Sequence, residues 1–171
     1  MGGDDKVRVI VRERPFNSRE KADDRTKITD LNEDDGSITV VNPSEPDAPP
    51  KQFSFDTVFG NTSRQSSVFD CIGKPICDNV MEGFNATIFC YGQTGTGKSH
   101  TMEGTPDDRG IMAGAFKYCF DSISLSDPSK VEFMVRCAYL EIYNENIRDL
   151  LSPTYVIVSS LKHLSSLFAL N

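Results

Sequence analysis

Eight consecutive residues have the types and spacing that bind the phosphate groups of a nucleotide. They read GQTGTGKS and satisfy the pattern of glycine, four residues, glycine, lysine and serine or threonine. Glycines let the backbone curl so that its N–H groups converge on phosphate oxygens, and a helix expected to begin at about Lys98 adds its positive dipole end. Lys98 would bring a full charge to the β- and γ-phosphates, and the Ser99 hydroxyl would ligate Mg²⁺. The predicted phosphate-binding residues are Gly92, Gln93, Thr94, Gly95, Thr96, Gly97, Lys98 and Ser99.

The segments on both sides of this loop have the pattern of elements that would hold it in place. The continuously apolar stretch Ala86–Tyr91 (ATIFCY) predicts a strand buried on both faces of a parallel sheet. After the loop, the spacing of Phe116, Phe120 and Ile123 predicts a helix packed on that sheet. The alternative, a glycine-rich turn with an incidental lysine, would not explain these flanks. We therefore interpret the loop as a phosphate-binding site.

Another helix is expected between Thr62 and Asn85. Thr62 and Gln65 fit a capping box, in which the threonine hydroxyl caps the new helix and the glutamine reaches back. Pro75 lies within the helix and predicts a kink or a late start. Gly83 or Asn85 is expected to end the helix in the left-handed conformation. Four apolar residues recur at steps of four and predict one packed stripe: Val68, Ile72, Ile76 and Val80.

The remaining segments complete an alternation of strands and helices. Residues 17–36 are polar and charged, and we expect them to form a surface excursion. The order strand, helix, strand, glycine loop, helix, strand is typical of an α/β protein. Four segments rich in β-branched or other apolar residues predict strands: Lys6–Arg12, Ser37–Val41, Lys51–Phe59 and Val131–Glu145.

Two weaker signals flank the region where a nucleotide base would lie. Arg12, Arg14 and Pro15 end the first predicted strand, and His100 directly follows the loop. Planar side chains of these kinds can stack on a base. A solvated strand end and a solvated histidine are the ordinary alternatives, and the residues alone leave both open. Metal ligation by His100 is not expected, because no second ligand has a suitable spacing.

The composition favours an acidic protein that does not bind nucleic acid. The 18 Lys and Arg residues face 25 Asp and Glu residues, a formal net charge of −7, whereas nucleic-acid binders usually carry a basic face. The five cysteines include no Cys-x-x-Cys pair, so we expect buried, reduced thiols in an intracellular protein. No secretion signal and no apolar run of membrane-spanning length is recognised.

Several motifs in a fixed order resemble the first half of a kinesin motor domain. They are RERPFN, FSFDTVFG, EGFNATIFCYGQ, GQTGTGKSHTMEG and YLEIYNENIRDLL, and the resemblance runs from about Lys6 to Pro153. Their wording is most similar to the kinesin subfamily that serves cilia. The resemblance implies an α/β P-loop NTPase fold, with a central mixed, mostly parallel sheet flanked by helices, that is incomplete here. We therefore expect the N-terminal half of a kinesin-like motor domain over residues 1–153 and a divergent tail, unlike the family, over residues 154–171.

The resemblance also implies ligands, partners and a location. It implies ATP or ADP bound with Mg²⁺, microtubule (tubulin) binding, and movement along microtubules of the cytoplasmic cytoskeleton, a cilium or a flagellum. It makes Glu103–Gly110 a short loop that interrupts the helix after the phosphate loop. Ala113 and Gly114 stand where the family usually has a proline and a polar or basic residue, which leaves the start of the next helix open. It places four residues around the adenine: Arg12, Arg14, Pro15 and His100.

Parts that the family uses for hydrolysis do not occur in this sequence. The resemblance implies two switches, NxxSSRSH and DLAGSE, and neither is present, so no catalytic residue is assigned. Glu141, an acidic residue in an apolar strand, is the one candidate substitute, but the resemblance places it at an ordinary strand position of the family. The microtubule-binding face is also expected to be largely missing. Taken alone, the 171-residue chain is expected to be truncated before both switches and inactive as an ATPase.

Three functions remain compatible with the residues. The first is an ATP-dependent microtubule motor, of which this chain is a fragment. The second is a nucleotide-binding fragment without hydrolysis or motility. The third is a P-loop NTPase of another lineage, which a strong preference for GTP would favour.

Overall fold

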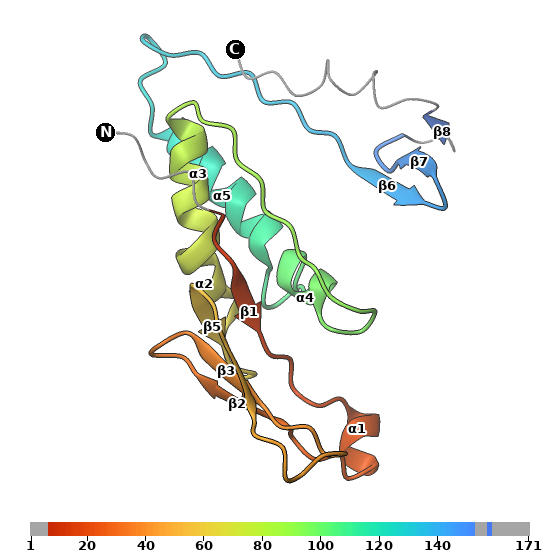
Figure 1. Cartoon of the computed structure of the whole chain (residues 1–171). Coiled ribbons are helices and arrows are strands. Elements are labelled where there is room, and N and C mark those ends of the chain that lie inside the picture. The colour runs from red at the N-terminus through yellow and green to blue at the C-terminus, as the bar shows by residue number, and fades with distance from the viewer. Residues whose placement is uncertain (1–6, 153–156, 159–171) are drawn as a thin grey trace. The chain divides into compact units, whose positions relative to one another are not determined.

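The computed structural model describes residues 7–152 and 157–158, and the chain divides into two units (Figure 1). The first unit comprises Met1–Asp121 and the second Ser122–Asn171. The expected divergent tail lies outside the described residues except at positions 157–158.

The first unit contains one parallel strand pair and one small antiparallel sheet. Strand β1 (Ile10–Arg12) pairs in parallel with β5 (Thr57–Phe59), so that Arg12 lies opposite Phe59. The antiparallel sheet has the order β2 (Thr29–Asn32), β3 (Ser37–Val40) and β4 (Lys51–Ser54). The β3 strand confirms the prediction for residues 37–41 within one residue.

The predicted strand Lys51–Phe59 is two strands, and the predicted strand over residues 6–12 begins only at Ile10. Asp56 explains the division. Its backbone N–H donates to the Val9 carbonyl at 3.0 Å, and its carboxylate accepts from the Val9 N–H at 2.7 Å. These bonds take the chain out of the antiparallel sheet and place it beside β1.

The predicted surface excursion over residues 17–36 contains a helix as well as β2. Helix α1 (Ser18–Ala22) begins at a capping box, in which Asn17 accepts from the Glu20 N–H and Glu20 accepts from the Asn17 N–H, both at 2.9 Å. The pattern of Asn followed three residues later by Glu is a helix-start signal. Most of these residues are exposed, as expected for an excursion.

A helical run follows β5, with a change of helix type before its proline. It consists of α2 (Gln65–Val68), a π-helical segment (Phe69–Gly73) and α3 (Lys74–Met81). Pro75 lies in the first turn of α3, where a missing N–H is tolerated. The sequence predicts a kink or a late start at Pro75. The helical run begins at Gln65, so it does not start late, and α3 begins at Lys74 directly after the π-helical segment. Gly83, with φ of +97°, provides the predicted left-handed stop.

The capping box predicted for Thr62 and Gln65 is wrong. Arg64 occupies the N-cap position, and no side chain caps the helix there. The Gln65 amide instead bonds to residues distant in the sequence, as described for the candidate site below. Long-range partners thus displaced the local bond.

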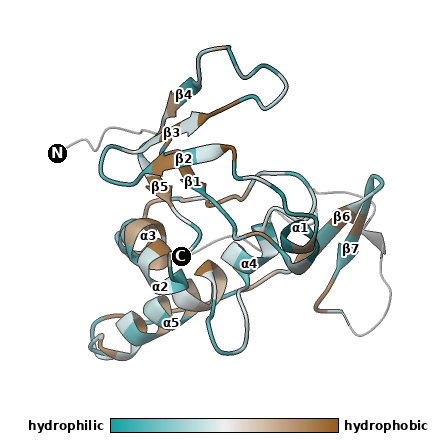
Figure 2. Cartoon of the chain, turned by 90° about the horizontal axis from the view of Figure 1, so that it is seen from below, coloured by the Kyte–Doolittle hydropathy of each residue, from teal (hydrophilic) through white to brown (hydrophobic). Residues whose placement is uncertain are grey.

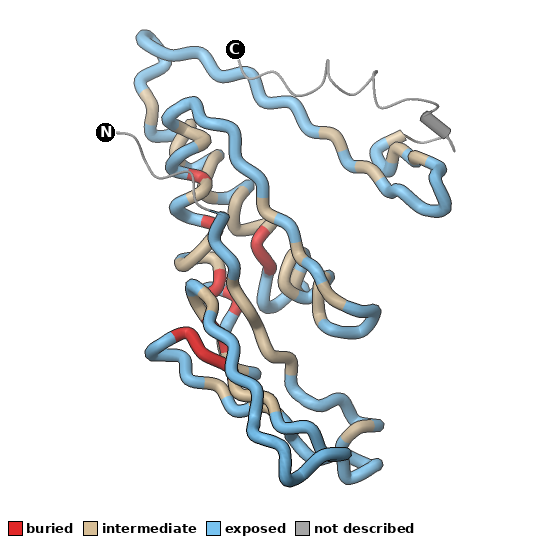
Figure 3. The backbone as a smooth tube through the Cα atoms, in the orientation of Figure 1, coloured by how far each residue is buried: buried red, intermediate tan, exposed pale blue. Residues whose placement is uncertain are grey.

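The core of the first unit forms where β5 meets the helices. Phe59, Val68 and Ile111 are buried together, and half-buried residues such as Ile10 and Ile88 pack against them. Figure 3 shows buried positions as short stretches within a mostly exposed backbone. In the predicted stripe Val68 is buried, and the other three residues are half-buried: Ile72, Ile76 and Val80.

The phosphate loop leads into two helices separated by a short loop. Helix α4 (Lys98–Met102) begins at the predicted residue, and α5 (Ile111–Ser124) follows the loop predicted over 103–110. A bridge between Gly104 and Arg109 closes that loop. Figure 2 shows that α3 and α5 each mix apolar and polar residues. Within the described residues, no helix is long and apolar enough to cross a bilayer.

Helix α5 lies against Phe69 of the π-helical segment. Gly114 lies against the Phe69 ring, and the Phe69 and Tyr118 rings are 6.4 Å apart. Phe116 and Phe120, predicted to pack on a sheet, are 52% and 51% exposed. The predicted strand Ala86–Tyr91, on which they were expected to pack, is not a strand in the structure.

The predicted buried strand Ala86–Tyr91 is not a strand in the structure. The segment has no ladder partner, and Phe89 and Tyr91 are 75% and 96% exposed. A strand of this kind exists only when neighbouring strands satisfy its N–H and C=O groups. No strand among the described residues is hydrogen-bonded to this segment.

The second unit contains an antiparallel sheet in the order β6 (Leu140–Tyr143), β7 (Asn146–Asp149) and β8 (Ile157–Val158). The strand predicted over residues 131–145 is therefore only four residues long. Asn144 and Glu145 have φ of +53° and +64° and form the turn of the β6–β7 hairpin, which ends the strand. No strand within the described part of the chain pairs with residues 131–139.

Candidate nucleotide-binding site

The phosphate loop curls around the ammonium group of its own lysine. Lys98 Nζ donates to the carbonyls of Gly92 and Gln93, each at 2.9 Å. The Gln93 carbonyl also accepts from the Thr96 hydroxyl at 2.7 Å. Phosphate oxygens are stronger acceptors than carbonyls for an ammonium group, so this cation is placed to exchange its partners for an anion at the loop.

Gly97 joins the loop to α4 in a conformation that favours glycine. Its φ is +101°, and it occupies the N-cap position directly before Lys98. A Cβ at Gly97 would lie 4.0 Å from the Cβ of Arg14. The loop therefore passes close to the segment that follows β1.

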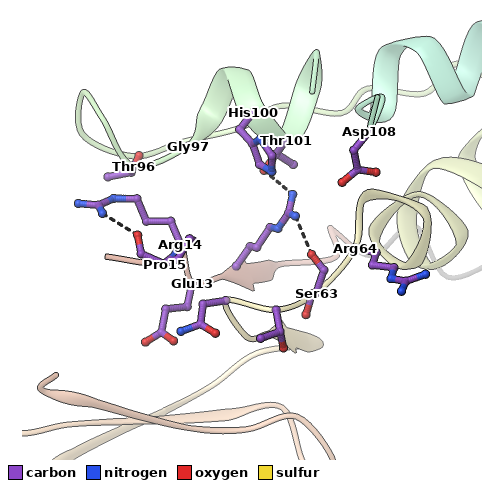
Figure 4. Close-up of a pocket in the computed structure, with 13 residues that line it drawn as sticks. Glu13, Arg14, Pro15, Ser63, Arg64, Thr96, Gly97, His100, Thr101 and Asp108 are labelled. Carbon is purple, nitrogen blue, oxygen red and sulfur yellow. Dashed lines mark hydrogen bonds between the residues drawn. The ribbon is translucent and has the colours of Figure 1, made fainter. Parts of the chain in front are cut away.

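A cavity of about 260 Å³ lies beside this junction (Figure 4). Three chain segments and one further residue form it: the end of β1, the turn before α2, the junction of loop and α4, and Asp108. All four residues expected around a base line it, whereas of the expected phosphate-binding residues only Thr96 and Gly97 do. The lining residues are Arg12, Glu13, Arg14, Pro15, Asn61, Thr62, Ser63, Arg64, Thr96, Gly97, His100, Thr101 and Asp108.

The Arg12 side chain donates hydrogen bonds to three segments at the cavity. Its guanidinium donates to Gln65 Oε1 at 2.7 Å, to the Thr101 hydroxyl at 3.1 Å and to the Ser63 carbonyl at 2.9 Å. Burial lowers the pKa of Arg12 from its ordinary value, and the charge of Asp108 opposes that shift. An arginine remains charged nonetheless, so the cavity contains a fixed cation.

Arg14 is bonded to α1. Its two terminal nitrogens donate to the two carboxylate oxygens of Glu20 at 2.6 and 2.5 Å, and it also donates to the Pro15 carbonyl at 3.0 Å. The bond from Arg14 is the largest cause that lowers the Glu20 pKa from 4.5 to about 2, followed by the bond from the Asn17 N–H. This pair fixes the Arg-Pro segment where it passes the loop.

The remaining expected residues have simple surroundings. His100 is exposed on α4, and its carbonyl accepts from the Gln65 amide. Ser99 is exposed in the first turn of α4. Glu141 is exposed on β6, and its Oε2 lies 4.0 Å from Arg148 Nη1 on β7. These surroundings agree with an ordinary strand position.

The side chains near the phosphate loop suit a metal ion that binds together with a nucleotide and not to the protein alone. In the part of the chain that the structure describes, no three His, Cys, Asp or Glu residues are grouped so that they could hold a metal ion. Magnesium in nucleotide sites typically uses one or two protein oxygens, with phosphates and water as its other ligands. The single Ser99 hydroxyl beside the loop fits that requirement.

All five cysteines are free, as expected, but they are not all buried. Cys77 is buried and Cys137 is exposed, while the other three are half-buried. Burial, followed by the neighbouring Cys119, raises the pKa of the Cys77 thiol to about 11. The buried thiol is therefore protonated at neutral pH.

Sequence patterns missed much of the cavity wall. Asn61, Ser63 and Arg64 precede α2, and Asp108 lies in the loop before α5. None belongs to a phosphate-binding motif, and only contacts across the fold bring them to the cavity. Gln65 was assigned to a local cap, so its bond to Arg12 was missed as well.

A glycine-rich loop that curls around its lysine and leads into a helix defines a P-loop nucleotide-binding protein. The family model described as "Kinesin motor domain" matches residues 12–167. The chain belongs to the kinesin motor domain family, and the predicted P-loop NTPase fold class is thereby confirmed. The matched range continues beyond Pro153, and the division expected there stays a prediction.

Curated relatives agree with the family. The chain is 43% identical over 150 residues to Kinesin-like protein KIF3C of Mus musculus and of Pongo abelii, which covers 85% of this chain and 19% of each relative. It is 43% identical over 158 residues to Kinesin-like protein klp-20 of Caenorhabditis elegans, which covers 91% of this chain and 24% of the relative. The chain thus spans about a fifth to a quarter of the length of these relatives.

Proposed function

We propose that the chain binds ATP with Mg²⁺ and forms the nucleotide-binding part of a microtubule motor. The observation that carries this proposal is the position of the cavity at the junction of the phosphate loop and α4. Thr96 and Gly97 belong to both features, so one ligand can reach both. Membership of the kinesin family supports the same assignment.

In this proposal the two ends of the nucleotide are bound by different segments. The backbone N–H groups of Gly92–Ser99 and the Lys98 ammonium bind the phosphates, and Ser99 ligates Mg²⁺, which neutralises phosphate charge when bound. At the other end the adenine lies in the cavity. It is bordered there by Arg12, Arg14, Pro15 and His100.

We propose that the whole protein moves along microtubules in the cytoplasm. The kinesin family and the relatives named above support this location on the cytoskeleton. The resemblance to ciliary-transport kinesins extends the proposal to a cilium or flagellum.

A second function is favoured for these 171 residues taken alone. The sequence contains neither NxxSSRSH nor DLAGSE, the motifs that would position water and metal for hydrolysis. Its net charge of −7 would also weaken binding to an acidic microtubule surface. We therefore propose nucleotide binding without hydrolysis or motility for the isolated polypeptide.

Calorimetric titration of the 171-residue chain with ATP, with and without Mg²⁺, tests the proposal. Lys98→Ala removes a charged donor whose bonds to phosphate contribute about 1.5–3 kcal/mol each, so affinity should fall roughly 100-fold. Lys117→Ala is the matched control, because that side chain is 77% exposed and forms an ion pair with Asp121 on the same helix. Equal ATP binding by wild type and Lys98→Ala would refute the site, and a strong preference for GTP would favour another P-loop lineage.

Phosphate release separates the two functions. For the isolated chain we expect no release above background, with or without microtubules. Microtubule-stimulated release by this chain would contradict the non-hydrolysing assignment and support a motor whose hydrolytic groups lie within these residues.

A further inference from the structure

Gln65 is a buried polar residue whose two amide atoms both have partners. Gln65 is the first residue of α2 and is only 1% exposed. Its Oε1 accepts from Arg12 Nη1 at 2.7 Å, and its Nε2 donates to the His100 carbonyl. One amide therefore connects the end of β1 with the helix that follows the phosphate loop.

This connection determines where the Arg12 guanidinium lies. Nη1 is shared between Gln65 and the Thr101 hydroxyl, while Nη2 donates to the Ser63 carbonyl. The acceptors come from α2, α4 and the preceding turn, so the guanidinium is held on more than one side. In Figure 4, dashed lines end at Ser63 and Thr101, which belong to different segments and both accept from Arg12.

We propose that Gln65 is a positioning residue for the base-binding side of the nucleotide site. It acts through Arg12 and the His100 carbonyl, and it holds the base cavity in a fixed relation to the helix that carries Lys98. This inference rests on the proposed nucleotide binding and assigns a role to a residue that itself does not line the cavity.

A packing role alone does not account for an amide at this place. The nearby core residues are apolar, and a leucine or methionine would fill a similar volume. A buried amide is unfavourable unless its donor and acceptor are both satisfied. Here both are satisfied by residues 53 and 35 positions away, which makes the amide a specific link between two parts of the site.

Two ligands distinguish positioning of the base side from general support of the fold. ATP needs the cavity and the loop, whereas inorganic tripolyphosphate needs only the loop. With the 171-residue chain, Gln65→Leu should weaken ATP binding roughly tenfold, the loss expected for one hydrogen bond to a charged group. Tripolyphosphate affinity should change by less than about twofold, because the Lys98 loop is untouched. Gln52→Leu, an exposed glutamine on β4, is the matched control.

Gln65→Glu provides the conservative comparison and covers the case in which Gln65→Leu does not fold. The carboxylate still accepts from Arg12 but cannot donate to the His100 carbonyl, so part of the ATP affinity lost in Gln65→Leu should return. The double variant Arg12→Met with Gln65→Leu should bind ATP no more weakly than Arg12→Met alone, because Gln65 acts through Arg12.

Each outcome decides the inference. A selective loss for ATP, partial recovery in Gln65→Glu and a non-additive double variant support it. Parallel losses of ATP and tripolyphosphate in both Gln65 variants, in step with a lowered melting temperature, would overturn it and leave a structural role only. A wild-type chain that binds neither ligand would overturn the proposed function together with this inference, whereas normal ATP binding by both Gln65 variants would overturn the inference alone.

Discussion

Replacing Gly114 by alanine tests how closely α5 packs on the π-helical segment. An added Cβ would lie 2.7 Å from Phe69 Cδ2, 2.9 Å from Cε2 and 3.0 Å from Cγ. The ring has little room to move away, because a Cβ at Gly73 would also come within 2.3 Å of it. Its other known neighbour is Tyr118, at a ring-centroid distance of 6.4 Å.

Two opposing effects determine the result. Alanine is favoured over glycine within a helix by about 1 kcal/mol, so propensity alone predicts stabilisation. Overpacking of a well-filled contact costs about 1–3 kcal/mol. Since the overlap involves three ring atoms, we expect the packing cost to prevail. The free energy of unfolding should fall by about 1 kcal/mol, which corresponds to a melting temperature roughly 2–4 °C lower.

Thermal and urea unfolding followed by circular dichroism measure this effect, and Phe69→Leu supplies the control. In the Phe69→Leu background the overlap is relieved, so Gly114→Ala should stabilise the chain by about 0.5–1 kcal/mol. A higher melting temperature for Gly114→Ala with Phe69 present would refute the reasoning. Additive effects of the two substitutions would refute it equally.

Two further predictions concern stability. Val68→Ala, at a core position only 1% exposed, should lower the free energy of unfolding by about 2 kcal/mol in urea unfolding, while Val41→Ala, at 41% exposure, should change it by less than about 0.5 kcal/mol. Equal losses would contradict the assigned core. Because the Arg14 pair lowers the Glu20 pKa from 4.5 to about 2, its stabilisation is present above pH 4.5 and is lost as pH falls toward 2. Glu20→Gln should therefore flatten melting temperature against pH across that window, and an unchanged profile would contradict the pair.

Features that depend on neighbouring residues were predictable from the sequence. The start of α4 at Lys98 and the left-handed stop at Gly83 follow from local backbone geometry. The position of Pro75 in the first turn of α3 follows from its missing N–H, which is tolerated only there within a helix. No distant contact was needed to specify any of them.

Features that depend on distant partners were not predictable in the same way. Ala86–Tyr91 has the composition of a buried strand, yet composition cannot supply the ladder that such a strand requires. The capping pattern at Thr62 and Gln65 failed, whereas the equivalent pattern at Asn17 and Glu20 formed a cap. The difference is that Gln65 found partners elsewhere in the fold, which the local pattern does not encode.

The candidate site also combines a part set by neighbouring residues with a part set by distant contacts, and substitutions in the two parts should affect different ligands. The phosphate loop is specified by eight consecutive residues, so changes there should affect every ligand that carries phosphates. The cavity is assembled from segments up to 96 positions apart, from Arg12 to Asp108. The Arg12 guanidinium is held there by hydrogen bonds to Gln65 and Thr101. Changes at these contacts should affect only ligands that carry a base. A comparison of ATP with tripolyphosphate therefore separates what the motif contributes from what the tertiary fold contributes.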